Sequence, residues 1–335
     1  MARLPLISPL DRALFLKAQP YLDGLPPNLL ALLAATTEEV FFPAGAHVLR
    51  ARDPIDTVYF FGSGAFEIIH GDGDRSAIFE LTAPGVVGLT DHLAQTIVPP
   101  AVRAAVDTFC LAITTEDLDQ ILEDFFPLVH QIARASCDSV IRARIAQPEL
   151  RSDEPGFPPD VQPAGDADPD LVQCLALARR APFLSGTNLT LLAELIKSDE
   201  PERIAPGEPL WRADDPIDRM ALVLDGAFVN DGRHGLARAG AGATLGAWEI
   251  AATRTRFEGW VAEMPSRILS IERELFIDLL EDHFEFAQAY LARVSEEITT
   301  AIRARAWRLR DAGATDRAPR PNRARDAGFA RPTRS

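Results

Sequence analysis

A repeat of a whole domain is the feature of this chain that most limits its fold. The letters RARDPID at residues 50–56 return as RADDPID at residues 212–218, and the match extends without a gap over residues 45–66 and 207–228. Ten of these twenty-two positions are identical, and most of the others exchange one apolar residue for another. Because the period is far longer than a solenoid unit, the sequence predicts two copies of one domain.

The repeat divides the chain into four parts. A length of 335 residues is enough for two domains that each bury a core. Residues 148–170 hold six prolines and seven acidic residues, a composition typical of a linker. We therefore expect copy one in residues 1–147, an acidic Pro-rich linker in 148–170, copy two in 171–310 and a basic disordered tail in 311–335.

Both copies show the same order of predicted elements. A short helical segment, at 25–36 and at 185–198, precedes short stretches rich in β-branched and aromatic residues, such as 58–70. Long helical segments over 115–147 and 273–310 close the two copies. Short, evenly spaced strands framed by helices predict a mainly β fold with flanking helices, made of two jelly-roll barrels that each carry helical N- and C-terminal segments.

Charge limits the partners of the chain. The net charge is −15, although residues 303–335 hold ten arginines and three aspartates, so the rest of the chain is strongly acidic. An acidic body argues against a domain that coats nucleic acid. The basic tail could contact RNA, a membrane surface or an acidic partner, or it could stay solvated beside its own acidic body.

The apolar and cysteine patterns bear on location. No run of about 18 apolar residues occurs, so we expect no membrane span. The first twenty residues carry charges and prolines and no clean cleavage pattern, which favours a helical start over a signal peptide. Three scattered cysteines, Cys110, Cys137 and Cys174, predict no disulfide framework and favour a cytoplasmic location.

The repeated stretch resembles the front half of the cyclic nucleotide-binding domain, a family that includes the cyclic-AMP receptor protein and the regulatory subunits of protein kinase A. The matching positions are Phe42, Gly45, Val48, Asp53, Ile55, Asp56, Val58, Tyr59 and Gly64 in copy one, and Gly207, Leu210, Asp215, Ile217, Asp218, Met220 and Gly226 in copy two. The resemblance covers about 110 residues of each copy and implies a non-enzymatic regulatory protein of signal transduction. It also places the repeated DPID at a turn between two barrel strands, where proline pre-sets a turn dihedral.

In this family a short helical cassette holds the ligand: a glutamate takes the ribose hydroxyl and an arginine takes the cyclic phosphate, whose oxygens fit an arginine fork. In copy one the resemblance places Gly88 at the glycine that precedes the glutamate, Leu89 at the glutamate and Val98 at the arginine. Arg103 lies where the family has an ordinary strand residue. Since both charged ligands are absent, we predict that copy one does not bind a cyclic nucleotide in the family's manner.

In copy two the resemblance places Gly246 at the glycine, Ala247 at the glutamate and Arg256 at the arginine, with Arg254 two residues earlier. These four residues are the predicted ligand cassette, which keeps a cation for a phosphate and lacks the carboxylate for a ribose. A cyclic nucleotide is the one candidate ligand, and we expect no cofactor. Glu249 would reach a ribose only if the cassette were shifted. The alternative for both arginines is a solvated loop.

The sequence gives little support for a metal site, an enzyme or a DNA-binding domain. The six histidines are scattered without an H-x-H pair, so we expect no metal site. No nucleophile elbow, P-loop or H-E-x-x-H motif occurs, so we expect no enzyme. About 25 residues follow the last helix, too few for a winged helix-turn-helix, so we expect no sequence-specific DNA binding. Trp248 and Trp260 flank the copy-two cassette, either as core residues or as a stacking lid for a base.

The last helix carries an apolar stripe. Ala287, Leu291, Val294, Ile298 and Ala301 recur at alternating spacings of four and three, which predicts a homodimer through this helix. The alternative is that the stripe packs back on its own barrel. Two functions therefore remain open: a sensor with any ligand in copy two, and an interaction scaffold that has lost its ligand and acts through dimerisation or an unknown protein partner.

Overall fold

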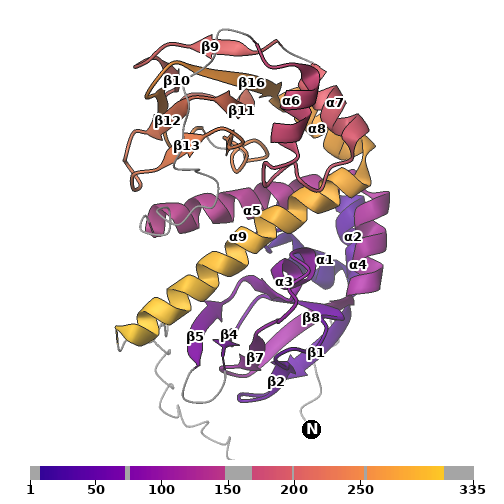
Figure 1. Ribbon diagram of the computed structural model, residues 1–335. Helices are drawn as coiled ribbons and strands as arrows, with labels where there is room; N and C mark the ends of the chain where they lie inside the picture. Colours follow the sequence, from indigo (N-terminus) through magenta and orange to yellow (C-terminus); the bar gives the residue numbers. More distant parts are fainter. Residues whose placement is uncertain (1–7, 72–75, 148–167, 198–199, 253–254, 313–335) are drawn as a thin grey trace, which may run out of the picture.

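The computed structural model describes residues 8–71, 76–147, 168–197, 200–252 and 255–312. Two mainly β domains lie at the two ends of the molecule, and long helices lie between them (Figure 1). Each domain holds two four-stranded antiparallel sheets. This arrangement confirms the predicted fold, two jelly-roll-like barrels with flanking helices.

Copy one opens with two helices, continues through its barrel and closes with two helices. Its strands pair in the orders β1-β8-β3-β6 and β2-β7-β4-β5. The two sheets enclose an aromatic centre in which Phe61 and Phe66 meet edge to face at 4.8 Å between ring centroids. The elements are α1 (Pro9–Lys17), α2 (Pro27–Thr36), β1 (Glu38–Phe42), β2 (His47–Leu49), β3 (Thr57–Phe61), β4 (Ala65–His70), β5 (Ala77–Thr82), β6 (Gly85–Val87), α3 (Leu89–Leu93), β7 (Ala101–Ala104), β8 (Thr108–Thr114), α4 (Thr115–Asp124) and α5 (Phe126–Ala146).

Copy two repeats this plan. Its sheets have the orders β14-β11-β16-β9 and β10-β15-β12-β13, which correspond strand by strand to those of copy one. In place of α3, residues 246–251 form a series of turns. The elements are α6 (Leu171–Ala178), α7 (Leu189–Lys197), β9 (Glu202–Ile204), β10 (Pro209–Trp211), β11 (Arg219–Asp225), β12 (Ala227–Asn230), β13 (Arg238–Gly240), β14 (Thr244–Leu245), β15 (Trp260–Ala262), β16 (Ser266–Glu272), α8 (Arg273–Asp282) and α9 (Phe284–Asp311).

The repeated DPID motif forms the predicted turn, between β2 and β3 in copy one and between β10 and β11 in copy two. The backbone carbonyl of its last aspartate also accepts a hydrogen bond from a closing helix. Asp56 O accepts a hydrogen bond from Thr115 N at 2.9 Å, and Asp218 O accepts one from Arg273 N at 2.7 Å. Thr115 and Arg273 are the first residues of α4 and α8, so the motif fixes where the closing helices leave each barrel.

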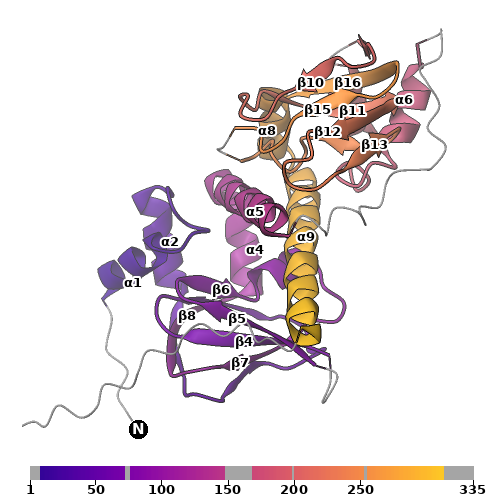
Figure 2. The same cartoon turned by 90° about the vertical axis from the view of Figure 1, so that its left-hand side faces the viewer.

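The closing helices of the two copies pack on each other. α5 of copy one and α9 of copy two lie side by side between the barrels (Figures 1 and 2). α9 then continues along copy one, where it contacts α3 and β5. The last helix of copy two therefore touches the other copy over much of its length.

This packing corrects the expected homodimer seam. Ala287, Leu291, Val294 and Ile298 are buried within one chain, and Ala301 is half-buried. The alternative, in which the stripe packs on its own barrel, is also only partly right. The stripe does pack within the chain, but it faces α5 and other parts of copy one. The periodicity of the stripe identified the buried face, and its partner lies in the other repeat.

One core joins both copies. Each barrel has its own interior cluster, around Phe66 in copy one and around Phe228 in copy two. A third and larger cluster contains helix residues from both repeats, such as Ile132 and Leu291. The two copies thus share a hydrophobic interior.

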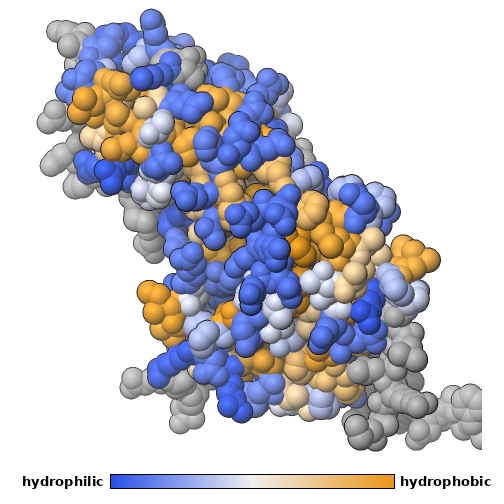
Figure 3. Space-filling view, turned by 90° about the vertical axis from the view of Figure 1, so that its right-hand side faces the viewer, coloured by the Kyte–Doolittle hydropathy of each residue, from blue (hydrophilic) through white to orange (hydrophobic). Residues whose placement is uncertain are grey.

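The surface shows separate hydrophobic areas among hydrophilic ones on the face drawn in Figure 3. Among the large apolar side chains that stay exposed, Ile97 is the most accessible, followed by Val172 and Leu236. Over the described residues, no helix combines the length and apolar character needed to span a membrane.

The shared core predicts that the two copies stay together when the chain is cut. A protease site engineered into residues 148–167 and then cleaved should give two fragments that still co-elute in size-exclusion chromatography. Leu291→Asp should separate the nicked fragments, because it places a charge in the core between α5 and α9. Separate elution of the unsubstituted fragments would contradict the shared core.

Candidate ligand site

The copy-two cassette begins at Gly246, directly after β14. Its φ is +77°, and a Cβ there would lie 2.6 Å from Arg256 Nη1 and 3.3 Å from the Trp211 ring. Both the backbone and the space therefore require glycine. The following turn buries Ala247 and Ile250 completely. Two of the predicted site residues, Gly246 and Arg256, thus lie next to each other, while Arg254 falls outside the described residues.

Arg256 is held by its own chain. Its side chain is 0% exposed. Nη1 donates to Glu249 Oε2 at 3.0 Å, and Nη2 donates to Asp218 Oδ1 at 3.3 Å and to the Arg219 carbonyl. The guanidinium also stacks on the Trp211 ring, 3.8 Å from its centroid. The expected alternative of a solvated loop is therefore wrong for Arg256.

Glu249 has a role beside Arg256 that the sequence did not predict. Its Oε1 accepts a hydrogen bond from Phe257 N at 2.8 Å, while Oε2 faces Arg256. Burial raises the pKa of the Glu249 carboxyl, and the Arg256 charge opposes that rise. A buried carboxylate thus accepts from the N–H edge of the guanidinium, which a ligand phosphate would also need for its hydrogen bonds.

Ala247 offers no ribose ligand. Its side chain is a buried methyl group, and its carbonyl accepts a hydrogen bond from Tyr290 Oη at 3.0 Å. The residues of copy two therefore do not fit a cyclic nucleotide held in the family's manner: the carboxylate for the ribose is absent, and the arginine is occupied.

Copy one has no charged side chain at either ligand position. Gly88 has a φ of +90°, and Leu89 is 0% exposed in the core. Arg52 N donates to Pro99 O at 3.2 Å, and the corresponding bond in copy two runs from Asp214 N to Arg256 O. The structural counterpart of Arg256 is thus Pro99, one residue after the predicted Val98. Neither Val98 nor Pro99 carries a charge.

Arg103 behaves as the ordinary strand residue that the sequence predicts. It lies in β7 and forms an ion pair with Glu67 of the neighbouring strand β4. It therefore does not replace the missing phosphate ligand.

The two tryptophans have separate structural roles. Trp260 is buried in the copy-two barrel. Trp248 packs edge to face against Phe183 at 4.1 Å and lies under the Arg144 guanidinium, 4.7 Å from the ring centroid. Since Arg144 comes from α5, Trp248 belongs to the contact between the copies, and neither ring is a free stacking lid.

A cleft of about 1270 Å³ lies where the copies meet. Its walls come from residues 94–98 of copy one, from the cassette of copy two and from α5 and α9. On its wall, Arg144 pairs with Glu297, and Arg293 pairs with Glu296 and Glu297, so these charges are largely balanced within the chain. Among the described residues, no group of histidine, cysteine and acidic side chains could hold a metal ion.

A second set of titratable groups lies at α3 of copy one. His92 Nε2 is 2.8 Å from Asp119 Oδ1. The neighbouring Asp91 is largely enclosed, and burial raises its pKa to about 6, against a hydrogen bond from Thr96 that lowers it. The charge of Asp91 thus changes at mildly acidic pH.

The internal ion pair predicts strong coupling between Arg256 and Glu249. Arg256→Met should reduce the free energy of unfolding by about 3–5 kcal/mol, because it leaves a buried carboxylate unpaired. Adding Glu249→Gln should recover much of that loss in urea unfolding. Arg238→Met, which breaks a half-exposed pair with Glu263, is the matched control and should cost under about 1 kcal/mol. Additive effects of the two buried substitutions would contradict the pair.

Asp91 predicts a pH dependence. Its folded pKa lies above the ordinary value of 3.8. Well below pH 3.8 the carboxyl is neutral in both states, and well above pH 6 it is ionised in both, so its destabilising effect develops between these limits as pH rises. Asp91→Asn should therefore stabilise the protein at pH 7 by on the order of 2 kcal/mol relative to its effect at pH 4. Equal effects at both pH values, measured by urea unfolding, would refute this.

The family model for the cyclic nucleotide-binding domain matches residues 39–125 and 201–283. These two regions together cover a little over half of the chain, and they coincide with the two barrels. A comparison with curated proteins gives no match.

A comparison with solved structures gives matches to regulatory proteins. The regulatory domain of protein kinase A from Toxoplasma gondii, co-crystallised with cAMP, is 13% identical over 84% of this chain and 98% of that chain, with a TM-score of 0.32. The regulatory subunit of a cAMP-independent protein kinase A from Trypanosoma brucei is 16% identical over 84% and 90%, with a TM-score of 0.32. The sensor domain of the transcriptional regulator DNR from Pseudomonas aeruginosa is 16% identical over 39% and 93%, with a TM-score of 0.35. On the evidence of the family model, found twice, this chain belongs to the cyclic nucleotide-binding domain family and carries the domain in tandem.

Proposed function

We propose that this chain is a non-enzymatic regulatory protein whose tandem domains act as an interaction scaffold, and that neither domain takes up a cyclic nucleotide in the family's manner. The observation that carries the proposal is the state of Arg256, which is fully buried and paired with Glu249. Copy one supports it as well, because Leu89 fills the glutamate position and Pro99 the arginine position.

The energetics of the ion pair argue against a tight nucleotide site. A cyclic phosphate could reach Arg256 only by displacing Glu249, and an unpaired buried carboxylate costs about 3–5 kcal/mol. That cost corresponds to a loss of affinity of about a hundred- to several-thousand-fold. The new bond between the phosphate and Arg256 would replace the existing charge-assisted bond between Glu249 and Arg256. It would therefore recover little of this free-energy cost.

A sensor is the second candidate, and the presence of Arg256 favours it. In this case the ligand, a cyclic nucleotide or a related anion, would bind at Gly246, Ala247, Arg254 and Arg256 after Glu249 had moved away. Its ribose would lack the carboxylate partner, so the contacts would be mainly to the phosphate.

The proposal also covers assembly and location. Because the stripe on α9 is buried against α5 and copy one, we expect a monomer, and a homodimer or protein partner would have to use another surface. We expect no sequence-specific DNA binding. Cys110, Cys137 and Cys174 are free and buried, which supports a cytoplasmic location.

Calorimetry separates the two candidates. We expect no binding heat and no thermal shift when the wild type is mixed with cyclic AMP, cyclic GMP or a cyclic dinucleotide at concentrations up to about a millimolar. Binding that is lost in the Glu249→Gln/Arg256→Met double variant and retained in Arg103→Ala would contradict the scaffold function and support the sensor function. The double variant is used because it keeps the buried site electrically neutral.

A further inference from the structure

The last turns of α9 are basic, although the body of the chain is acidic. Residues 301–312 hold one aspartate and four arginines, Arg303, Arg305, Arg308 and Arg310. Arginines near a helix C-terminus stabilise the helix dipole, but that effect is confined to the last turn. Arg303 and Arg305 lie before the last turn of α9, which ends at Asp311. The helix dipole therefore does not account for them.

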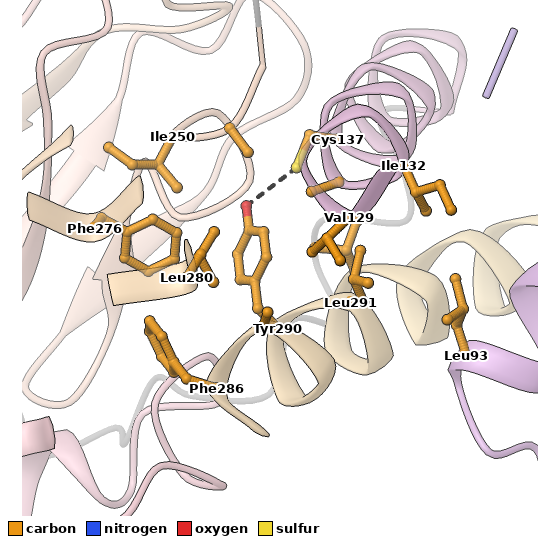
Figure 4. Close-up of a cluster of buried hydrophobic side chains, with 14 of the residues drawn as sticks. Leu93, Val129, Ile132, Cys137, Ile250, Phe276, Leu280, Phe286, Tyr290 and Leu291 are labelled. Atoms are coloured by element: carbon orange, nitrogen blue, oxygen red, sulfur yellow. Dashed lines mark hydrogen bonds between the residues drawn. The ribbon is translucent and has the colours of Figure 1, made fainter. Parts of the chain in front are cut away.

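The first half of α9 holds this basic end in place. Phe286, Tyr290 and Leu291 are buried in the core that joins the two copies (Figure 4). The helix continues without a break to Asp311 and contacts α3 and β5 of copy one. Its end lies at the edge of copy one, beside β5 (Figure 1). A binding surface on such a fixed element loses little conformational entropy when a partner binds.

Two of the four arginines rest on aromatic rings. Arg305 lies over the ring of Phe79 in β5, 5.5 Å from the ring centroid. Arg310 lies over the ring of Trp307, 5.0 Å from the ring centroid. Both arginines are exposed. Because the rings carry no net charge, these two contacts position the guanidinium groups and leave their positive charge in place.

Arg303, Trp307 and Arg310 share one face of α9, since they follow one another at spacings of four and three. Seven residues separate the two arginines, which places them about 10 Å apart along the helix axis. Both are exposed, and Trp307 between them is half-buried. The positive field also reaches copy one, where burial and the Arg303 charge lower the pKa of His70 to about 4.

A nucleotide strand offers the two chemical groups that this face can take. Arginine forks bind phosphate oxygens, and bases stack on aromatic rings and on guanidinium groups. A membrane surface would need an exposed apolar face on the helix. The apolar side chains of these turns do not form one, because Ile302 packs against the core and Ala306 is buried. An acidic protein would supply charge but no flat group for Trp307.

We propose that the end of α9 binds a single-stranded nucleic acid, with Arg303 and Arg310 on its phosphates and a base against Trp307. The sequence after Ala312 adds six arginines and two aspartates, so further phosphates of the same strand would meet further cations. The contacts read no base edge, so the binding is independent of sequence. It goes beyond the scaffold function and does not involve the cassette of either copy.

Fluorescence anisotropy of the full chain with a labelled oligouridylate tests the proposal. A length of about 20 nucleotides exceeds the sites of about 4–16 nucleotides that single-strand binders occupy. Arg303→Gln/Arg310→Gln should weaken binding at least about tenfold, because two charge-assisted bonds to phosphates are lost. It should also reduce the slope of log affinity against log salt by about 1.4, the value for two phosphates of a single strand.

Arg233→Gln/Arg238→Gln is the matched control for charge. It removes the same two charges from exposed ion pairs of copy two. Because salt screens distant surface charges, this variant should bind the oligouridylate within about twofold of the wild type. Equal weakening by the two double variants would overturn the proposal, and so would a wild type that does not bind the oligouridylate.

Trp307→Leu separates a nucleic acid from other polyanions. It should weaken binding of the oligouridylate about five- to hundredfold and leave binding of polyglutamate, which has no bases, unchanged. Trp307→Phe keeps an aromatic ring and should recover much of the binding. Stronger binding of polyglutamate, or of phosphatidylcholine vesicles that contain phosphatidylserine, would assign the surface to an acidic protein or a membrane and overturn the proposal. If Trp307→Leu loses the circular dichroism spectrum of the wild type, the arginine variants and their salt slopes decide the question.

Discussion

The contact between α5 and α9 is the interaction on which the rest of the molecule depends. These helices close the two copies, and each of them lies against the cassette region of the other copy: Arg144 of α5 lies over Trp248 beside the copy-two cassette, and α9 contacts α3. Separation of the pair would expose apolar side chains of the largest buried cluster among the described residues. Burial of apolar surface is the main source of stability in a domain, so the pair sets the positions of both barrels.

The state of the cassettes follows from this arrangement. Each cassette packs between its own barrel and a helix from the other repeat, and Leu89 and Ala247 are apolar and buried in place of an exposed carboxylate. In copy two the remaining arginine then needs an internal partner, because an isolated buried charge is very unfavourable. Glu249 supplies it. A buried pair of this kind adds little net stability, and its main effect is to fix one arrangement of the groups around it.

The fold was predictable because its signals are local. Turn residues such as DPID and the runs of β-branched residues depend on a few neighbouring positions, and the repeat presents them twice. The missing ligands at Leu89 and Ala247 were visible for the same reason. The pairing of Glu249 with Arg256 could not be predicted from the sequence, because it depends on the path of the turns between them. The partner of the α9 stripe was also missed, since periodicity identifies the buried face of a helix and leaves open what covers it. The burial of both α5 and α9 shows that each of them needed a partner.

Covalent connection explains why the stripe finds its partner within the chain. Residues 148–167 join α5 to copy two, and tethers of this length give effective concentrations of about a millimolar for the elements that they connect. A second chain would have to reach a similar free concentration to compete for the same face of α9. The tandem repeat therefore provides internally a helix pair that a single copy could form only by association of two chains. Because the two helices then lie in one chain, their sequences are free to differ. Counted from the first residue of each helix, Tyr290 of α9 corresponds to Ile132 of α5.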